Sequence, residues 1–250
     1  MGFDSADQPA SMHPEGDAIM TTTTFVFDAY GTLFDVAAAA RELAEEPGQE
    51  EFAEHWRKVA EVWRLKQLQY TWIRAITGAH TDFWEVTQNA LDNALDVVLL
   101  NGEEHRELRE RLLQLYWELS AYPEVPKMLQ ELKDAGLNTA ILSNGSPDML
   151  EGAVKSAGIG PLLDDVLSVE DVGIFKPDHR VYELVTKRFD CKPEEVIFVS
   201  SNGWDAAAAS GFGFRSCWVH RNSGDQVDRL PWKPEFVLED LKFVADLRRV

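Results

Sequence analysis

The sequence predicts an α/β fold: a Rossmann-like core with a parallel sheet covered by helices on both faces, plus an inserted all-helical cap. Short β-branched and aromatic runs alternate with helical patterns through most of the chain, which is typical of a covered parallel sheet. One long stretch, from about 36 to 122, carries helical patterns only. At roughly 100–200 residues per domain, the 250 residues suit one large domain or a core with a smaller appendage.

The first strand is expected in 21–27, which reads Thr-Thr-Thr-Thr-Phe-Val-Phe and leads into a turn at Gly31. Further strands are expected at 137–142, 165–168, 196–199, 216–219 and 236–238. Helical patterns lie between them at 126–135, 147–157, 178–189 and 204–210. The strand–helix alternation assigns 21–36 and 121–250 to the Rossmann-like core.

The inserted stretch, 37–120, is expected to be the helical cap. Apolar residues recur there at helical spacing, in one series from Phe52 to Trp63 and another from Leu108 to Leu119. Such stripes are more often packing surfaces than cofactor sites, and they can also form a dimer seam. Residues 1–20 carry acids, prolines and little apolar periodicity, so we expect a disordered N-terminal extension.

The composition excludes several classes of protein. Lys and Arg total 24 against 43 Asp and Glu, and a formal charge of −19 argues against nucleic acid and anionic membranes as partners. No apolar run approaches the ~18–20 residues that cross a bilayer. The two cysteines, Cys191 and Cys217, form no metal or disulfide pattern, which predicts a reduced, cytoplasmic chain.

Polar side chains follow the predicted strands. Ligands of open parallel sheets bind beyond the carboxyl ends of the strands, so these side chains are expected to converge. They are Asp28 and Thr32 after the first strand, Ser143 and Asn144 after the second, Lys176 in a later loop, and Ser200, Asn202 and Asp205 after a further strand. Each alone has an ordinary structural explanation, such as a helix cap for Asp28 or Asp205. Their order along the chain favours a catalytic site.

This order resembles the haloacid dehalogenase superfamily. Most members with this core are phosphatases with a second acid two residues after the nucleophile, where this chain has Tyr30. Their fourth motif carries acids that hold magnesium, where this chain has Ser200-Ser201-Asn202. A phosphoryl group needs a metal and a general acid, whereas a haloacid loses halide without a proton. The departures therefore imply no metal and no cofactor.

Five longer strings are similar to the (S)-2-haloacid dehalogenase branch: 28–35, 63–72, 142–147, 176–183 and 198–205. The resemblance implies hydrolysis of short (S)-2-haloalkanoic acids to (R)-2-hydroxy acids and halide, through an aspartyl ester and with inversion at C2. It also implies that the protein forms a homodimer and that its ligand is a small haloacid. The alternatives are a magnesium-dependent phosphatase acting on a small phosphate monoester and a catalytically silent binding protein.

The same resemblance implies the role of each residue. Asp28 is the nucleophile, held by Lys176 and Thr32, and Arg64 of the cap accepts the halide. Asp205, positioned by Ser200 and Asn202, handles the hydrolytic water. The substrate is expected to meet apolar walls from Leu68, Phe83 and Trp204, and its carboxylate to meet Ser143, Asn144 and turn amides near Tyr30. Tyr182 is expected to support either Lys176 or the substrate carboxylate.

Overall fold

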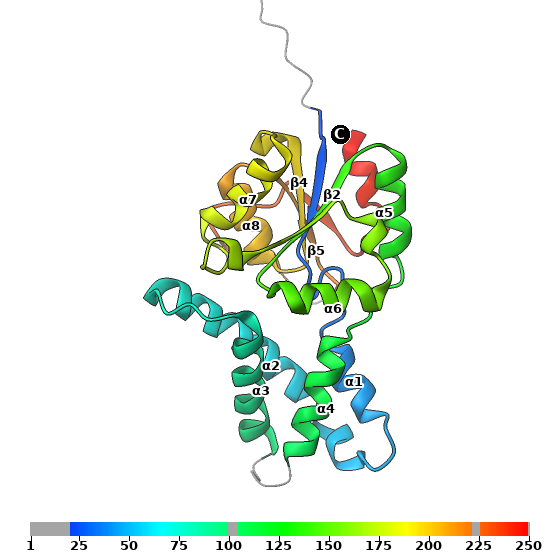
Figure 1. Cartoon of the computed structure of the whole chain (residues 1–250), viewed down its shortest axis with the longest axis vertical. Helices are drawn as coiled ribbons and strands as arrows, with labels where there is room; N and C mark the ends of the chain where they lie inside the picture. The colour runs from blue at the N-terminus through cyan, green and yellow to red at the C-terminus, as the bar shows by residue number, and fades with distance from the viewer. Residues whose placement is uncertain (1–20, 100–104, 222–225, 250) are drawn as a thin grey trace, which may run out of the picture.

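A computed structural model of the chain describes residues 21–99, 105–221 and 226–249. The expected N-terminal extension, 1–20, lies outside this range. The six strands form one parallel sheet in the order β3-β2-β1-β4-β5-β6 (Figure 1). Their bounds are β1 Thr24–Phe27, β2 Asn138–Ser143, β3 Asp165–Ser168, β4 Val196–Ser200, β5 Arg215–Val219 and β6 Phe236–Leu238. The predicted parallel α/β core is confirmed.

The first strand lies in the interior of the sheet. Phe25 is in register with Thr139 of β2 on one side and with Ile197 of β4 on the other. Every residue of β1 is buried, as expected for a strand covered on both faces. The strand order reverses at β1, so the residue after Phe27 stands at the topological switch point, where such sheets bind ligands.

Helices cover both faces of the sheet (Figure 1). α7 (His179–Phe189) and α8 (Gly203–Phe212) lie on one face, and α5 (Val125–Asp134) lies on the other with the C-terminal 3-10 segment Val244–Arg249. α6 (Pro147–Ala157) follows β2. Three short 3-10 turns, at Gly160–Leu162, Val169–Asp171 and Pro193–Glu195, were not predicted. The predicted strand at 21–27 is too long, because pairing begins at Thr24.

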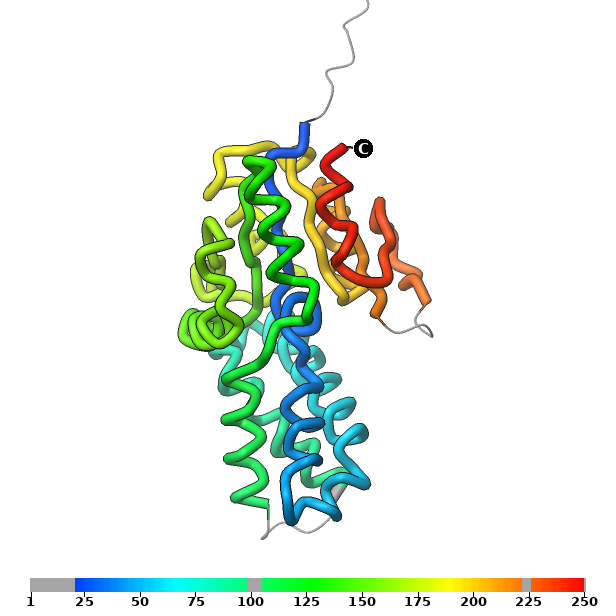
Figure 2. The backbone as a smooth tube through the Cα atoms, turned by 90° about the vertical axis from the view of Figure 1, so that its right-hand side faces the viewer, coloured from blue at the N-terminus to red at the C-terminus, as the bar shows by residue number. Residues whose placement is uncertain are grey.

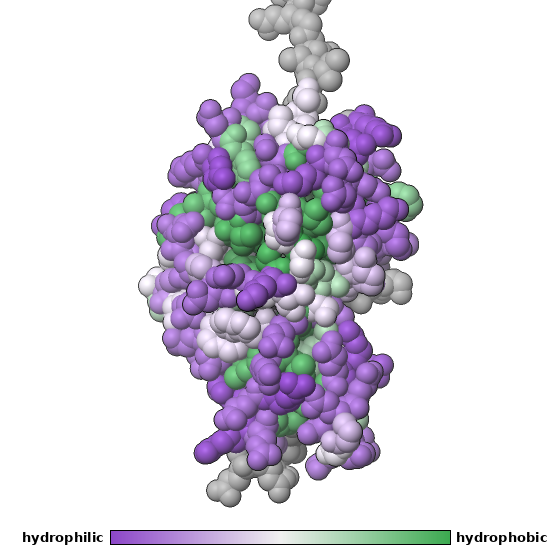
Figure 3. Space-filling model, turned by 45° about the vertical axis from the view of Figure 1, so that its right-hand side comes forward, coloured by the Kyte–Doolittle hydropathy of each residue, from purple (hydrophilic) through white to green (hydrophobic). Residues whose placement is uncertain are grey.

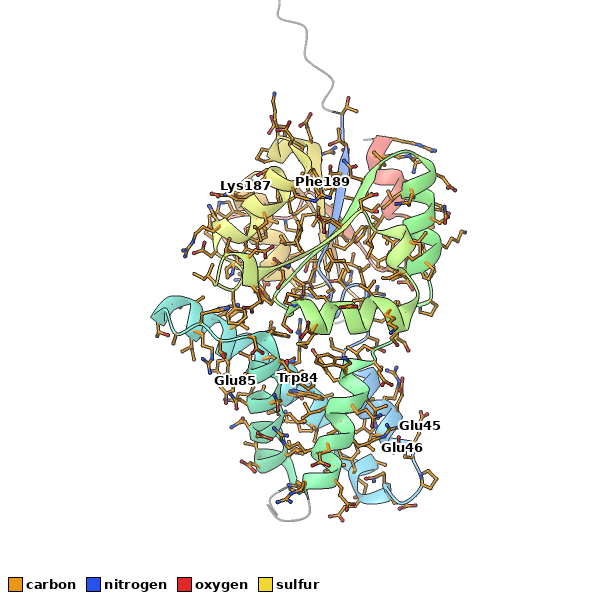
Figure 4. The ribbon with its side chains drawn as sticks, viewed as in Figure 1. Glu45, Glu46, Trp84, Glu85, Lys187 and Phe189 are labelled. Atoms are coloured by element: carbon orange, nitrogen blue, oxygen red, sulfur yellow. The ribbon has the colours of Figure 1, made fainter. Side chains whose placement is uncertain are left out.

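Four helices between β1 and α5 form the cap below the core in Figure 1. They are α1 (Ala38–Ala44), α2 (Glu50–Thr77), α3 (Phe83–Leu99) and α4 (His105–Trp117). The predicted apolar stripe of α2 is buried at Phe52, Val59 and Trp63. Trp84 of α3 points toward α4 (Figure 4), where its ring meets Trp117 with centroids 4.9 Å apart. The stripes therefore pack the cap interior.

Two chain segments connect the cap to the core, and Figure 2 shows them side by side. Phe34 and Ala121 form an antiparallel bridge, and the Tyr122 N–H donates to the carbonyl of Leu33 at 2.9 Å. We call residues 32–35 and 120–124 the connecting ribbon. Because these hydrogen bonds join the entering and leaving chain, the ribbon sets the position of the cap over the sheet.

The face of the molecule in Figure 3 is mostly hydrophilic around its edges, with hydrophobic areas at its centre. This agrees with the formal charge of −19 over the whole chain. Within the described ranges, every helix is too short or too polar to span a bilayer.

Candidate active site

A small cavity lies at the carboxyl edge of the sheet, lined by residues of both core and cap. Its free volume is about 10 Å³, which is room for roughly one water molecule. Arg64 and Leu68 come from α2 and Phe83 from α3, so the cap closes the cavity. The other lining residues are Asp28, Tyr30, Ser143, Asn144, Lys176, Asn202 and Trp204. All of these are residues that the sequence predicted for the site.

Asp28 follows β1 directly, and its backbone N–H continues the ladder to Val199 of β4. The residue is 7% exposed, and both carboxylate oxygens accept hydrogen bonds. Oδ1 lies 3.2 Å from the Nζ of Lys176. Oδ2 accepts from the Asn202 amide at 2.9 Å and from the Thr32 hydroxyl at 3.1 Å. These contacts fix the orientation of the carboxylate at the floor of the cavity.

Two glycines allow the turns around Asp28 to approach each other. Gly31 has a φ of +92°, a left-handed conformation that strains other residues. Gly145 lies against the Tyr30 ring, where an added Cβ would come within 2.8 Å of Cε2. A side chain at Gly145 would therefore displace Tyr30 from the cavity wall.

Lys176 connects two buried carboxylates. Its Nζ lies 2.9 Å from Oδ2 of Asp205 as well as 3.2 Å from Asp28, and it is 1% exposed. Burial by itself lowers the pKa of Lys176, but the charges of Asp205 and Asp28 outweigh burial, so its pKa is raised above 10.5. The lysine therefore keeps its charge throughout the neutral range.

Asp205 lies in the first turn of α8, behind Lys176, and does not line the cavity. Besides Lys176, it accepts hydrogen bonds from the hydroxyls of Tyr182 at 2.7 Å and Ser200 at 3.2 Å. Complete burial raises the pKa of Asp205 above 3.8 and the charge of Asp28 adds to this, while Lys176 and Tyr182 oppose it. Burial and the Asp205 charge raise the pKa of Tyr182 well above 10, so this phenol remains a neutral donor.

Arg64 reaches from the cap into the core. Its Nη2 donates to the backbone carbonyl of Tyr30 at 3.0 Å and to Oδ1 of Asn202 at 3.2 Å. Asn202 thereby bridges Arg64 to Asp28. Trp204, beside this pair, packs edge-on against Trp72 of α2 with ring centroids 5.4 Å apart.

Ser143 and Asn144 supply donors on the β2 side of the cavity. Ser143 Oγ accepts from the Gly145 N–H at 3.0 Å, and Asn144 Oδ1 accepts from the Lys176 N–H at 2.9 Å. Within the described chain, this leaves the hydroxyl hydrogen of Ser143 and the amide hydrogens of Asn144 as donors to an anion.

Two further serines support the site, Ser201 as expected from its place at a strand end and Ser168, which was not predicted from the sequence. The Ser201 N–H donates to the Thr32 hydroxyl at 2.8 Å, and the Ser168 hydroxyl donates to the Gly145 carbonyl at 2.7 Å. Ser168 is the last residue of β3, so its position at the same sheet edge was a usable signal.

The profile of the haloacid dehalogenase-like hydrolase family matches residues 22–213. (S)-2-haloacid dehalogenase 1 of Pseudomonas sp. strain CBS-3 is 45% identical over 196 residues, covering 78% of this chain and 83% of the relative. The chain belongs to the (S)-2-haloacid dehalogenase branch of this family.

Solved structures of this family superpose on the whole fold. A dehalogenase crystallised with an intermediate complex has a TM-score of 0.85 and 36% identity, over 92% of this chain and 98% of its own. The L-2-haloacid dehalogenase of Xanthobacter autotrophicus, solved with chloropropionic acid covalently bound, has a TM-score of 0.79 and 35% identity, over 91% and 98%.

Proposed function

We propose that this protein hydrolyses short (S)-2-haloalkanoic acids to (R)-2-hydroxy acids and halide. The observation that carries this proposal is the arrangement around Asp28: a carboxylate oriented by Lys176, Thr32 and Asn202, in a cavity that Arg64 enters from the cap. Membership of the family supports the reaction, and a relative with covalently bound chloropropionic acid supports the substrate class.

In the first step, one carboxylate oxygen of Asp28 attacks C2 of the haloacid. A carbon–oxygen ester bond forms as the carbon–halogen bond breaks, and the halide leaves with its electron pair. Attack is in line, so the halide departs from the face opposite Asp28, which gives inversion. The guanidinium of Arg64 and the amide of Asn202 stabilise the developing negative charge in a nearly closed cavity.

The substrate is oriented by its own carboxylate. Ser143, Asn144 and the turn amides near Tyr30 bind that group. Oriented uncharged donors of this kind attract an anion locally, although the net charge of the protein is negative. Leu68, Phe83 and Trp204 form the apolar wall around the substituents on C2.

In the second step, water attacks the ester carbonyl carbon of Asp28. The tetrahedral oxyanion is stabilised by the donors that already bind the carboxylate, above all Lys176. Asp205 lies behind Lys176, so it assists the proton transfer from water through its ion pair with Lys176 and keeps that lysine in place. Ser200 and Tyr182 orient the Asp205 carboxylate. As the intermediate collapses, the bond between the Asp28 carboxyl carbon and the C2 oxygen breaks, and that oxygen takes up the proton that the water lost. The hydroxy acid is released and Asp28 is again a carboxylate.

The phosphatase alternative fits the donor set poorly. A magnesium ion prefers several carboxylate and carbonyl oxygens. The Tyr30 carbonyl already accepts from Arg64, and the neighbours of Asp28 are Lys176 and Asn202. Among the described residues, no group of three or more His, Cys, Asp or Glu side chains is arranged to hold a metal.

Halide release tests the proposal against both alternatives. We expect the enzyme to release chloride from (S)-2-chloropropionate, to be far slower on the (R) isomer, and to be unaffected by EDTA. Phosphate release that requires magnesium would favour the phosphatase, and no turnover of either substrate would favour a silent binding protein. An Asp28→Asn variant is the matched control for contaminating activity.

We also propose a homodimer in a reducing, cytoplasmic compartment. α2 carries large exposed apolar side chains on one face, Leu65 at 57%, Ile73 at 50% and Ile76 at 85% exposure, and such a patch is typical of an interface. Cys191 and Cys217 are both free thiols, which suits a reducing environment.

A further inference from the structure

A cationic side chain beyond β5 contacts both segments that connect the cap to the core. Arg221 stands two residues after Val219, the last residue of β5. Its Nη2 donates to the backbone carbonyl of Thr32 at 2.9 Å, and its Nη1 donates to Oε1 of Glu124 at 2.8 Å. The guanidinium carbon lies 3.5 Å from the centroid of the Tyr122 ring. One core residue thus joins the chain entering the cap to the chain leaving it.

Partial burial and ring stacking strengthen the interactions of Arg221. The side chains of Arg221 and Glu124 are only 16% and 13% exposed, so their attraction is screened less than that of a surface pair. A planar guanidinium also stacks well on an aromatic face. Burial raises the pKa of Tyr122 to about 12, so the ring beneath Arg221 stays neutral in the working range.

Thr32 links the contact to the nucleophile. Its hydroxyl accepts the Ser201 N–H at 2.8 Å and donates to Oδ2 of Asp28 at 3.1 Å. The Thr32 hydroxyl also lies 3.1 Å from the Ser201 Oγ, which is a competing acceptor. A hydroxyl has a single hydrogen, so the orientation of Thr32 decides whether Asp28 or Ser201 receives it. Arg221 binds the carbonyl of this same residue and so restricts the peptide that follows it.

We propose that Arg221 is a positioning residue for the dehalogenation. It holds the connecting ribbon so that the Thr32 hydroxyl stays on Asp28 and Arg64 stays at the halide end of the cavity. Asp28 belongs to the core and Arg64 to the cap, so the ribbon fixes the distance between the nucleophile and the halide acceptor. The inference rests on the proposed function.

The test compares Arg221→Gln with Arg215→Gln. Arg215, at the other end of β5, has the same kind of surroundings: it pairs with Glu235 at 2.7 Å and lies over the Phe236 ring at 5.1 Å. Both variants lose one partly buried ion pair and one cation–π contact. We expect similar falls in the thermal midpoint, because each substitution removes one ion pair and one cation–π contact, Arg215 from the start of β5 and Arg221 from just beyond its end.

Activity is expected to separate the two variants. We expect Arg221→Gln to lose about 10–100-fold in kcat/KM on (S)-2-chloropropionate, since small misplacements of reacting groups cost rates of this size. The loss on (S)-2-bromopropionate is expected to be smaller, because bromide leaves more easily and depends less on Arg64. Arg215→Gln should stay within about threefold of wild type with an unchanged bromide-to-chloride ratio.

Three outcomes would overturn the proposal: a folded Arg221→Gln enzyme with wild-type kcat/KM and ratio, an equal loss in Arg215→Gln, or an equal loss on both substrates. Glu124→Gln, which keeps the Arg221 contact to Thr32, provides a milder second variant if Arg221→Gln does not fold. It is expected to shift the bromide-to-chloride ratio in the same direction, and an unchanged ratio would count against the proposal. A wild-type enzyme inactive on both substrates would instead contradict the proposed function.

Discussion

Asp28, Lys176 and Asp205 form a buried acid–cation–acid series. A single lysine charge balances two carboxylates, and the charge of Asp28 adds to the rise in the pKa of Asp205. The hydrogen bonds into Asp205 from Tyr182 and Ser200 favour its ionised form. The reaction is therefore expected to depend on the protonation state of Asp205 at a given pH.

The Tyr182→Phe variant tests this dependence. The raised pKa of Asp205, caused first by burial, predicts that kcat falls on the acid side with a midpoint above 3.8. The Tyr182 hydrogen bond lowers that pKa, so its loss should move the acid limb to higher pH and leave kcat above the limb less affected. The measurement is a kcat–pH profile, with Tyr70→Phe on α2 as the control.

The linkage to stability has the corresponding sign. A carboxyl whose folded-state pKa is raised contributes stability that is present at low pH and lost as pH rises through that pKa.

In the kcat–pH profile, an acid limb that stays in place in Tyr182→Phe would mean that Asp205 does not control the step that limits turnover.

The core elements could be predicted from the sequence because their signals are local. Thr24–Phe27 is β-branched and aromatic, and a parallel sheet brings all its strand ends to one edge, so Asp28, Ser143 and Ser200 had to converge. The position of Asp205 behind Lys176, outside the cavity lining, depends on side-chain packing and could not be predicted. The reach of Arg221 to the connecting ribbon was unpredictable for the same reason.

The cap depends on a buried polar network between its helices. Gln67 of α2 is 1% exposed and donates to the Thr87 hydroxyl at 3.0 Å and to the Tyr116 hydroxyl at 3.1 Å. Trp63, one turn earlier, donates to the Thr87 carbonyl at 2.9 Å. Arg64 is adjacent to Trp63, so this network also fixes the segment that carries the proposed halide acceptor.

Gln67→Leu should therefore destabilise the protein by about 1–3 kcal/mol, because buried hydroxyls lose their partner. The matched control is Gln69→Leu, the same change two residues along at an exposed position, expected to stay within about 0.5 kcal/mol. Urea unfolding with m-values compared between variants makes the measurement. Equal stability of the two variants would show that the network contributes nothing net.

In the molecule as a whole, the core and the cap meet at the cavity of the candidate active site. Core and cap each supply part of the lining, and the net charge of −19 surrounds it. An anionic substrate must approach against that field, so local donors and the cations Arg64 and Lys176 have to provide the attraction.

The proposed dimer is tested with Leu65→Asp/Ile76→Asp. Two charges placed on the exposed apolar face of α2 should yield a monomer by sedimentation velocity, while wild type sediments as a dimer. Phe243→Asp, at an apolar residue 65% exposed on the core, is the control and should leave the dimer intact. A monomeric wild type, or a double variant that remains dimeric, would contradict the interface.

The most direct test of the mechanism is a single turnover of (S)-2-chloropropionate in ¹⁸O-water, with enzyme in excess. Water attacks the ester carbonyl of Asp28, so we expect ¹⁸O in the peptide containing Asp28 and unlabelled 2-hydroxypropionate. Mass spectrometry of both species gives the answer. Label in the product and none in the Asp28 peptide would mean that water attacks C2 directly, and the covalent mechanism would be wrong.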